Sequence, residues 1–171
     1  AKAAGVKHIV YTSMAYPEPG NPTPMAPGHY FTEQAIKASG IPYTIVRMSW
    51  YAENLLGSLP AAVASGKWFT SSGEGAISHV TREDTARAAA GALLSDSAGN
   101  RVLTVTGPAA LTTPEIAAIA GDIAGRPIEV VKLSDEAYTA GLKQAGLPEG
   151  LPELFTTFEV LQRQGGLSMV T

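Results

Sequence analysis

The sequence alternates between short apolar segments rich in β-branched residues and longer segments with helical periodicity, which leaves few fold classes open. Strand-like segments occur at 8–13, 41–49, 101–108 and 127–134, and helix-like segments at 29–39, 81–95, 111–125 and 135–146. Strands and helices that alternate with short connections are typical of parallel sheets covered by helices. The sequence therefore predicts an α/β fold with a parallel sheet.

The remaining regions are less regular. Residues 54–66 are typical of a short helical region that Pro60 interrupts. Residues 67–80 are typical of a hairpin or of a strand with a glycine turn, and the tail from Leu147 is irregular with a short helix at 151–163.

Helix-end residues support two of the predicted helices. Thr81 can cap the helix at 81–95, whose first turn carries acidic residues. Pro114 at the first position and Gly125 just past the end frame the helix at 111–125.

Composition excludes several classes of protein. The chain has 171 residues, of which 45% are hydrophobic, and a net charge of −3, so it can bury one core but offers no basic surface. Nucleic acid and membrane surfaces are therefore not expected partners, and no apolar run is long enough to span a bilayer. The chain has no cysteine, which rules out disulfides and thiolate chemistry. We expect a cytoplasmic protein.

The first residues look like the end of a longer unit. AKAAGVK reads as the last turn of a helix with Gly5 as its C-cap, followed directly by a strand, and there is no initiator methionine. We expect that a segment precedes this chain in the complete protein.

Several stretches of the sequence resemble one protein family. SGIPYTIVR at 39–47, followed by WYAEN at 50–54, is the most specific of them, and VTREDTARA at 80–88 adds to it. The likeness continues in order over nearly the whole chain. These residues resemble the NmrA-like branch of the short-chain dehydrogenase/reductase superfamily, and in particular its bacterial type 2 NAD(P)H:quinone oxidoreductases.

The resemblance implies a Rossmann-like fold of which this chain is the second half. Family members open with a glycine-rich nucleotide loop that this sequence lacks. Residues 1–171 are then a partial NAD(P)-binding domain with a small C-terminal substrate-binding region. The Rossmann part comprises about 1–66 and 81–108, and the substrate side about 67–80 and 109–171.

The same resemblance singles out His29. Reductases of the superfamily carry a Tyr-x-x-x-Lys pair on the helix that comes after the strand corresponding to 8–13 and the loop behind it. Extended members have a glutamate four residues after the lysine. Counting back from Glu33 puts His29 in the lysine position and Met25 in the tyrosine position. His29 is therefore the expected catalytic residue, because it can donate a hydrogen bond or a proton. The alternative is a helix-start histidine and an exposed Glu33 without function.

Residues at the carboxyl ends of two strands are expected to bind the cofactor, because open α/β sheets bind ligands there. The expected cofactor-binding residues are Thr12, Ser13, Ser49, Trp50, Tyr51, Ala52, Glu53 and Asn54. The alternative for the two aromatic residues is that they pack a loop onto the core. Arg47 is expected to pair with a carboxylate of the fold rather than with a phosphate.

Tyr51, Phe69 and His79 are the expected substrate-binding residues, since in similar proteins the region 69–84 closes over the substrate. His79 has the alternative of a structural histidine beside a strand end. Gly73 and Gly75 read as turn glycines, and no His, Asp or Glu residues have metal-ligand spacing.

The resemblance implies an NAD(P)H-dependent reductase of quinones or related electron-poor carbonyl compounds that acts by direct hydride transfer. NADP(H) is expected in preference to NAD(H), with no metal and no flavin, and a small-molecule quinone is the expected partner. The alternative is a non-catalytic NAD(P) sensor that acts through a protein partner, as the fungal NmrA regulator does. A sheet edge left open by the missing strands would also favour a homo-oligomer.

Overall fold

The computed structural model describes residues 1–95 and 99–171. A parallel sheet holds three strands in the order β1 (Ile9–Met14), β2 (Tyr43–Met48) and β5 (Arg101–Val105). This sheet confirms the predicted α/β class. Its central strand is the most buried because it is paired on both edges and covered on both faces, and Ile45 and Val46 are fully buried.

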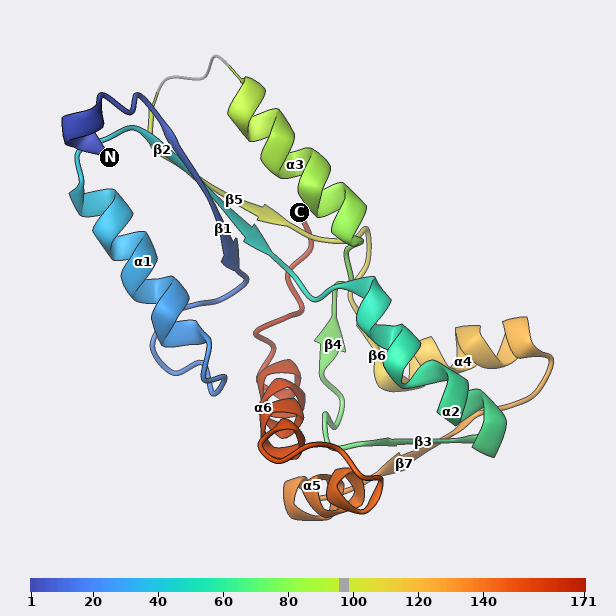
Figure 1. Ribbon diagram of the computed structural model, residues 1–171. Coiled ribbons are helices and arrows are strands. Elements are labelled where there is room, and N and C mark those ends of the chain that lie inside the picture. The colour runs from blue at the N-terminus through green and yellow to red at the C-terminus, as the bar shows by residue number, and fades with distance from the viewer. Residues whose placement is uncertain (96–98) are drawn as a thin grey trace.

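Two helices cover this sheet. Figure 1 shows α1 (Ala26–Ala38) and α3 (Arg82–Leu94) on opposite sides of it. Because side chains alternate along a strand, Tyr11 and Ser13 of β1 share one face with their register partners on β2, and Thr12 points to the other. The first residues form a 3₁₀ turn, η1 (Lys2–Ala4), which ends at Gly5 with a left-handed φ of 71°.

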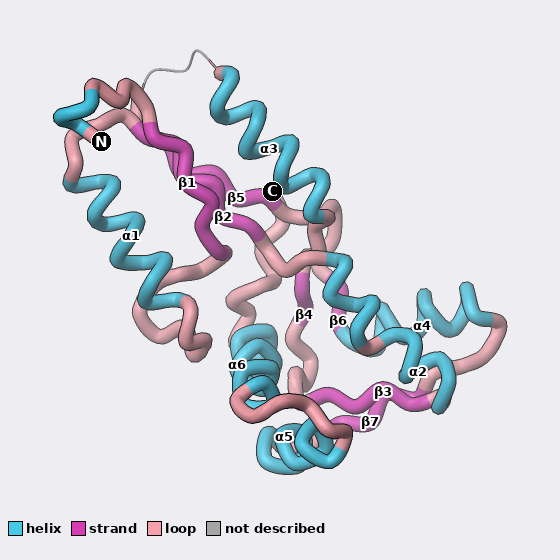
Figure 2. Tube along the Cα trace, viewed as in Figure 1, coloured by secondary structure: helices cyan, strands magenta, loops and turns pink. Residues whose placement is uncertain are grey.

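A second region lies below the carboxyl ends of the sheet in Figure 1. Two short strand pairs lie in it: β3 (Lys67–Thr70) runs parallel to β7 (Glu129–Lys132), and β4 (Ala76–Ile77) antiparallel to β6 (Leu111–Thr112). Its helical elements are η2 (Ala52–Gly57), α2 (Leu59–Ser65), α4 (Thr113–Ala124), α5 (Asp135–Gln144) and α6 (Leu151–Arg163). Figure 2 shows how loops join these short elements.

Of the two alternatives for residues 67–80, the hairpin is wrong and the strand with a glycine turn is confirmed. β3 and β4 are joined by a turn at Gly73, whose φ is +60°, but each pairs with a strand from much later in the chain. The glycine turn itself is confirmed, and the Gly75 N–H donates to the Ser72 carbonyl to close it.

Proline positions explain where two helices begin. Pro27 and Pro60 both lie in the first turn of a helix, so α1 begins earlier than residue 29, and Pro60 belongs to the start of α2 rather than interrupting it. Proline fits there because the first-turn N–H groups have no partner within the helix. The predicted caps are confirmed: the Thr81 side chain accepts from the Asp84 N–H.

The main core cluster joins the sheet to the second region. It contains Ala15, Ile77, Ile116, Phe158, Leu161 and Leu167, with Trp50, Leu55, Trp68, Leu111 and Leu154 packed against it. In the described part of the chain, no helix has the length and apolar character needed to cross a bilayer. The core cluster holds α6 against the carboxyl ends of β1 and β2.

Candidate functional site

A cavity of about 160 Å³ lies at the carboxyl ends of β1 and β2. Five of the predicted site residues line it, namely Ser13, His29, Ser49, Trp50 and Tyr51, and the side chains of Met25, Met48 and Phe158 are among those that complete its walls. Sheet strands, the start of α1 and helix α6 thus contribute to one space. It is the position at which open α/β sheets bind ligands.

His29 is held in this cavity by a tyrosine. The Tyr11 hydroxyl lies 2.8 Å from His29 Nδ1, and the two ring centroids are 5.9 Å apart. The other ring nitrogen, Nε2, has no hydrogen-bond partner among the described residues. Nε2 is therefore the atom that His29 can offer to a bound molecule.

Glu33 lies one helical turn after His29 and is fully buried. Its carboxylate accepts hydrogen bonds from Arg47 Nε at 2.9 Å, from Arg47 Nη2 at 2.7 Å and from Lys37 Nζ at 3.2 Å. The exposed Glu33 that we considered as an alternative is thus wrong, and the expected pairing of Arg47 with a carboxylate is confirmed. Arg47 Nη1 also donates to Glu18 Oε1 at 2.6 Å, which ties the loop between β1 and α1 to the sheet.

These contacts control the charge of Glu33. Burial acts to raise the pKa of its carboxyl, but the interactions with Arg47, Ser13 and Lys37 outweigh burial and hold that pKa below its usual value. An ion pair that is charged at neutral pH is therefore fixed beneath the first turns of α1.

Trp50 and Tyr51 form an aromatic wall. Trp50 packs on Phe158 of α6 with ring centroids 4.1 Å apart, and the Arg82 guanidinium lies 4.3 Å from the centre of the Tyr51 ring. Trp50 thus packs on the core and also lines the cavity. Packing of the loop onto the core and a place at the candidate site are therefore compatible for this side chain. Phe158 thus restrains the orientation of the Trp50 ring, and Arg82 restrains that of the Tyr51 ring.

The other predicted cofactor residues have different positions. The Ser13 hydroxyl is fully buried, and its interaction with the Glu33 carboxylate helps to lower the pKa of that carboxyl. Ser49 Oγ lies 3.0 Å from Ser78 Oγ. Thr12 is exposed on the opposite face of β1 from Ser13 and does not line the cavity.

Residues 52–54 also lie outside the cavity lining. The Glu53 carboxylate accepts the Arg82 N–H at 2.9 Å, and Asn54 Oδ1 accepts from Arg82 Nη2 at 3.2 Å. The Ala52 N–H donates to the Val80 carbonyl at 2.9 Å. These contacts join η2 to the start of α3, so in this structure the three residues brace the aromatic wall.

Phe69 and His79 are not brought to the cavity. Phe69 is 49% exposed on β3, where it pairs in register with Val131. His79 follows β4, and burial lowers the pKa of its imidazole, which favours the neutral ring. Their role in substrate binding stays a prediction.

Three residues that line or support the site were not predicted from the sequence, namely Tyr11, Phe158 and Leu167. Tyr11 shares a strand face with Ser13, so strand alternation could have revealed it. Phe158 and Leu167 reach the cavity from the far end of the chain, and nothing in their local sequence marks them. Leu167 arrives there because its carbonyl accepts the Ser78 N–H at 2.9 Å.

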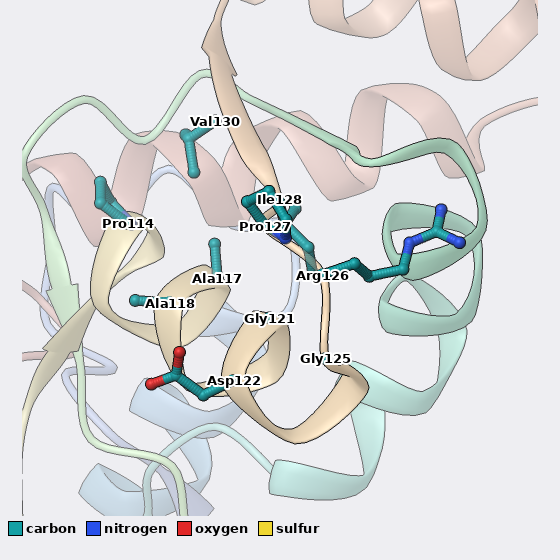
Figure 3. Close-up of a pocket in the computed structure, with 10 residues that line it drawn as sticks. All are labelled: Pro114, Ala117, Ala118, Gly121, Asp122, Gly125, Arg126, Pro127, Ile128 and Val130. Atoms are coloured by element: carbon teal, nitrogen blue, oxygen red, sulfur yellow. The ribbon is translucent and has the colours of Figure 1, made fainter.

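A larger hollow of about 670 Å³ lies elsewhere, along α4 and the turn into β7. Figure 3 shows its lining, mostly small or apolar residues, with Asp122 and Arg126 as the charged ones. None of the predicted site residues lies in it. In the two described segments, no three His, Asp or Glu side chains form a group that could hold a metal ion.

Comparison with known proteins relates this chain to reductases. It is 38% identical to quinone oxidoreductase 2 of Escherichia coli over 98% of this chain and 58% of that protein. It is 32% identical to the NAD(P)H azoreductase of Xenophilus azovorans over 90% of this chain and 54% of that protein. The chain therefore spans less than two thirds of the length of these relatives.

Solved structures agree in fold. The E. coli NADPH-dependent quinone oxidoreductase in complex with NADPH matches with a TM-score of 0.92 and 37% identity over 99% of this chain and 59% of that one. Triphenylmethane reductase of Citrobacter sp. with NADP(H) matches with a TM-score of 0.91 and 31% identity over 100% of this chain and 60% of that one. The sequence model of the NmrA-like family covers residues 1–168. This chain belongs to the NmrA-like family.

Proposed function

We propose that the protein containing this chain is an NAD(P)H-dependent reductase of quinones or related electron-poor carbonyl compounds. The observation that carries the proposal is the position of His29 in a cavity walled by Trp50 and Tyr51 at the carboxyl ends of β1 and β2. The similarity to a quinone oxidoreductase and to an azoreductase supports the same reaction class.

The cavity suits the nicotinamide end of a dinucleotide. Its aromatic wall offers a face for a flat ring, and the Ser13 hydroxyl, which belongs to the cavity lining, would hold a polar group of that ring. When bound, the reduced dinucleotide supplies a hydride. Ser13, Trp50 and Tyr51 would orient this ring and keep water from it.

His29 would act on the substrate oxygen. One quinone, one hydride and one proton give one hydroquinone, and negative charge develops on the oxygen as the hydride arrives. His29 Nε2–H would donate a hydrogen bond to that oxygen, and the proton would come from solvent. Met25 stands where other reductases of the superfamily have a tyrosine, and an electron-poor quinone makes a dedicated acid less necessary.

We further propose NADP(H) as the preferred cofactor. Two of the structures that this chain resembles contain NADPH or NADP(H).

The test is NADPH oxidation by the complete protein with a simple benzoquinone or naphthoquinone as acceptor. We expect turnover by the wild type, and a loss of about tenfold or more in kcat for His29→Ala, because a hydrogen-bond donor to the developing charge is removed. His8→Ala is the matched control, because His8 precedes β1 at the opposite end of the sheet and bonds to Thr44.

The sensor alternative makes the opposite prediction. A protein that binds both the oxidised and the reduced dinucleotide but turns over no quinone would contradict the enzyme proposal. Retention of full kcat in His29→Ala would contradict the role of His29.

A further inference from the structure

Tyr11 is half-buried on β1, next to the candidate site but outside the cavity lining. The one hydrogen bond of its hydroxyl within the described chain joins it, at 2.8 Å, to His29 Nδ1. Tyr11 therefore acts on the cavity only through His29.

The direction of this hydrogen bond follows from the two groups. A neutral imidazole has one nitrogen that donates and one that accepts, and a phenol can donate its hydrogen to the accepting nitrogen. If Tyr11 instead accepted from Nδ1–H, its own hydrogen would be left to solvent, because His29 is the one hydrogen-bond partner of this hydroxyl among the described residues. Donation from Tyr11 to Nδ1 uses the hydrogen-bonding capacity of both groups.

We infer that Tyr11 is a positioning residue that holds His29 in the tautomer with its hydrogen on Nε2. Tyr11 as donor leaves Nδ1 unprotonated in the neutral ring, so Nε2 carries the hydrogen. In the protonated ring Nδ1–H donates to the Tyr11 oxygen, and Nε2 still carries a hydrogen. In both states His29 presents a donor to the cavity.

This inference rests on the proposed function for its catalytic consequence, but not for its structural part. A reduction that builds negative charge on a substrate oxygen needs a donor there, and the wrong tautomer would present a lone pair instead. Glu33 supports the same arrangement, since its ion pair with Arg47 fixes α1 one turn after His29.

The structural part is tested by nitrogen-15 NMR of the histidine side chains in the complete protein. The spectrum is taken at about pH 8, above the ordinary titration range of histidine. The His29 signals are identified by their absence in His29→Gln. We expect the wild type to show hydrogen on Nε2 alone, and Tyr11→Phe to show a mixture of both tautomers. Tyr43→Phe is the control, because Tyr43 lies on the same sheet face without a hydrogen bond to His29.

The kinetic part compares the same variants in NADPH oxidation with a quinone. We expect Tyr11→Phe to lower kcat about two- to tenfold, as loss of one hydrogen bond predicts, with KM nearly unchanged and Tyr43→Phe like the wild type. An unchanged His29 tautomer in Tyr11→Phe, or an effect on KM alone, would overturn the inference. A tautomer change in a protein without quinone turnover would support the assignment of Tyr11 while contradicting the proposed function.

Discussion

Arg47 donates two hydrogen bonds to the buried Glu33 carboxylate, at 2.9 Å from Nε and 2.7 Å from Nη2. Arg47→Met would leave Glu33 buried without its main partner, so we expect the free energy of unfolding to fall by about 3–5 kcal/mol. Chemical denaturation of the variant measures this loss. The double variant with Glu33→Gln should recover part of it, and strictly additive effects would contradict the coupling.

The lowered pKa of Glu33 predicts how stability depends on pH. A carboxyl whose folded-state pKa lies below its ordinary value of 4.5 stabilises the fold fully above that value, and the stabilisation is lost as pH falls through the folded-state pKa. Glu33→Gln removes this contribution. We therefore expect a shallower loss of stability below about pH 4.5 in Glu33→Gln, measured by thermal unfolding across acidic pH. Parallel curves for both proteins would refute this.

The carboxyl of Glu159 is expected to change stability with pH in the opposite direction from Glu33. Burial of this α6 residue outweighs the hydrogen bonds from Thr70 and the Ser71 N–H, and it raises the pKa of the Glu159 carboxyl above its ordinary value. Its charged form therefore costs stability above the folded-state pKa, and that cost disappears as pH falls through the interval down to the unfolded pKa. We expect Glu159→Gln to be more stable than the wild type at pH 7, and this advantage to shrink on acidification. Glu149→Gln, in an exposed turn, serves as the control in the same unfolding experiment.

Gly107 packs directly against backbone. A Cβ atom at this position would overlap the His79 carbonyl oxygen, so Gly107→Ala should lower the free energy of unfolding by about 1–3 kcal/mol. Gly91 is the matched control, because a Cβ there meets nothing within 4 Å and the residue lies inside α3. Gly91→Ala should raise stability by about 0.5–1 kcal/mol, and equal effects of both variants in denaturation would contradict this reading.

Phe158 shapes the cavity wall through its contact with Trp50. Phe158→Leu should cost about 1 kcal/mol of stability and, in the proposed reduction of quinones by the complete protein, raise KM more than it lowers kcat, because the residue shapes the space without reaching a reacting atom. Steady-state kinetics measures the split. Phe155→Leu, on the same helix and 38% exposed, should leave both constants near wild type. A loss confined to kcat would show that Phe158 does more than shape the space.

Features that depend on residues close together in the sequence could be predicted from it. The α/β class follows from local periodicity, and the helix ends follow from single residues such as Thr81 and Gly125, whose hydrogen bonds reach only a few positions along the chain. The position of Trp50 and Tyr51 at the cavity could also be predicted, because carboxyl ends of parallel strands meet at one edge of a sheet, whereas His29 was predicted from the family resemblance.

Long-range contacts determined the rest. Glu33 is indistinguishable in the sequence from an exposed helical glutamate, and only the approach of Arg47 from β2 allows its burial. β3 and β4 are near neighbours in the chain, yet they pair with β7 and β6, because each short strand completes its hydrogen bonds where packing brings a free edge. Phe158 closes the cavity from α6 because the hydrophobic core packs its ring on Trp50. Local sequence determined which elements form, whereas burial and backbone pairing between distant segments determined which side chains meet, since those energies depend on contacts that no short stretch of sequence contains.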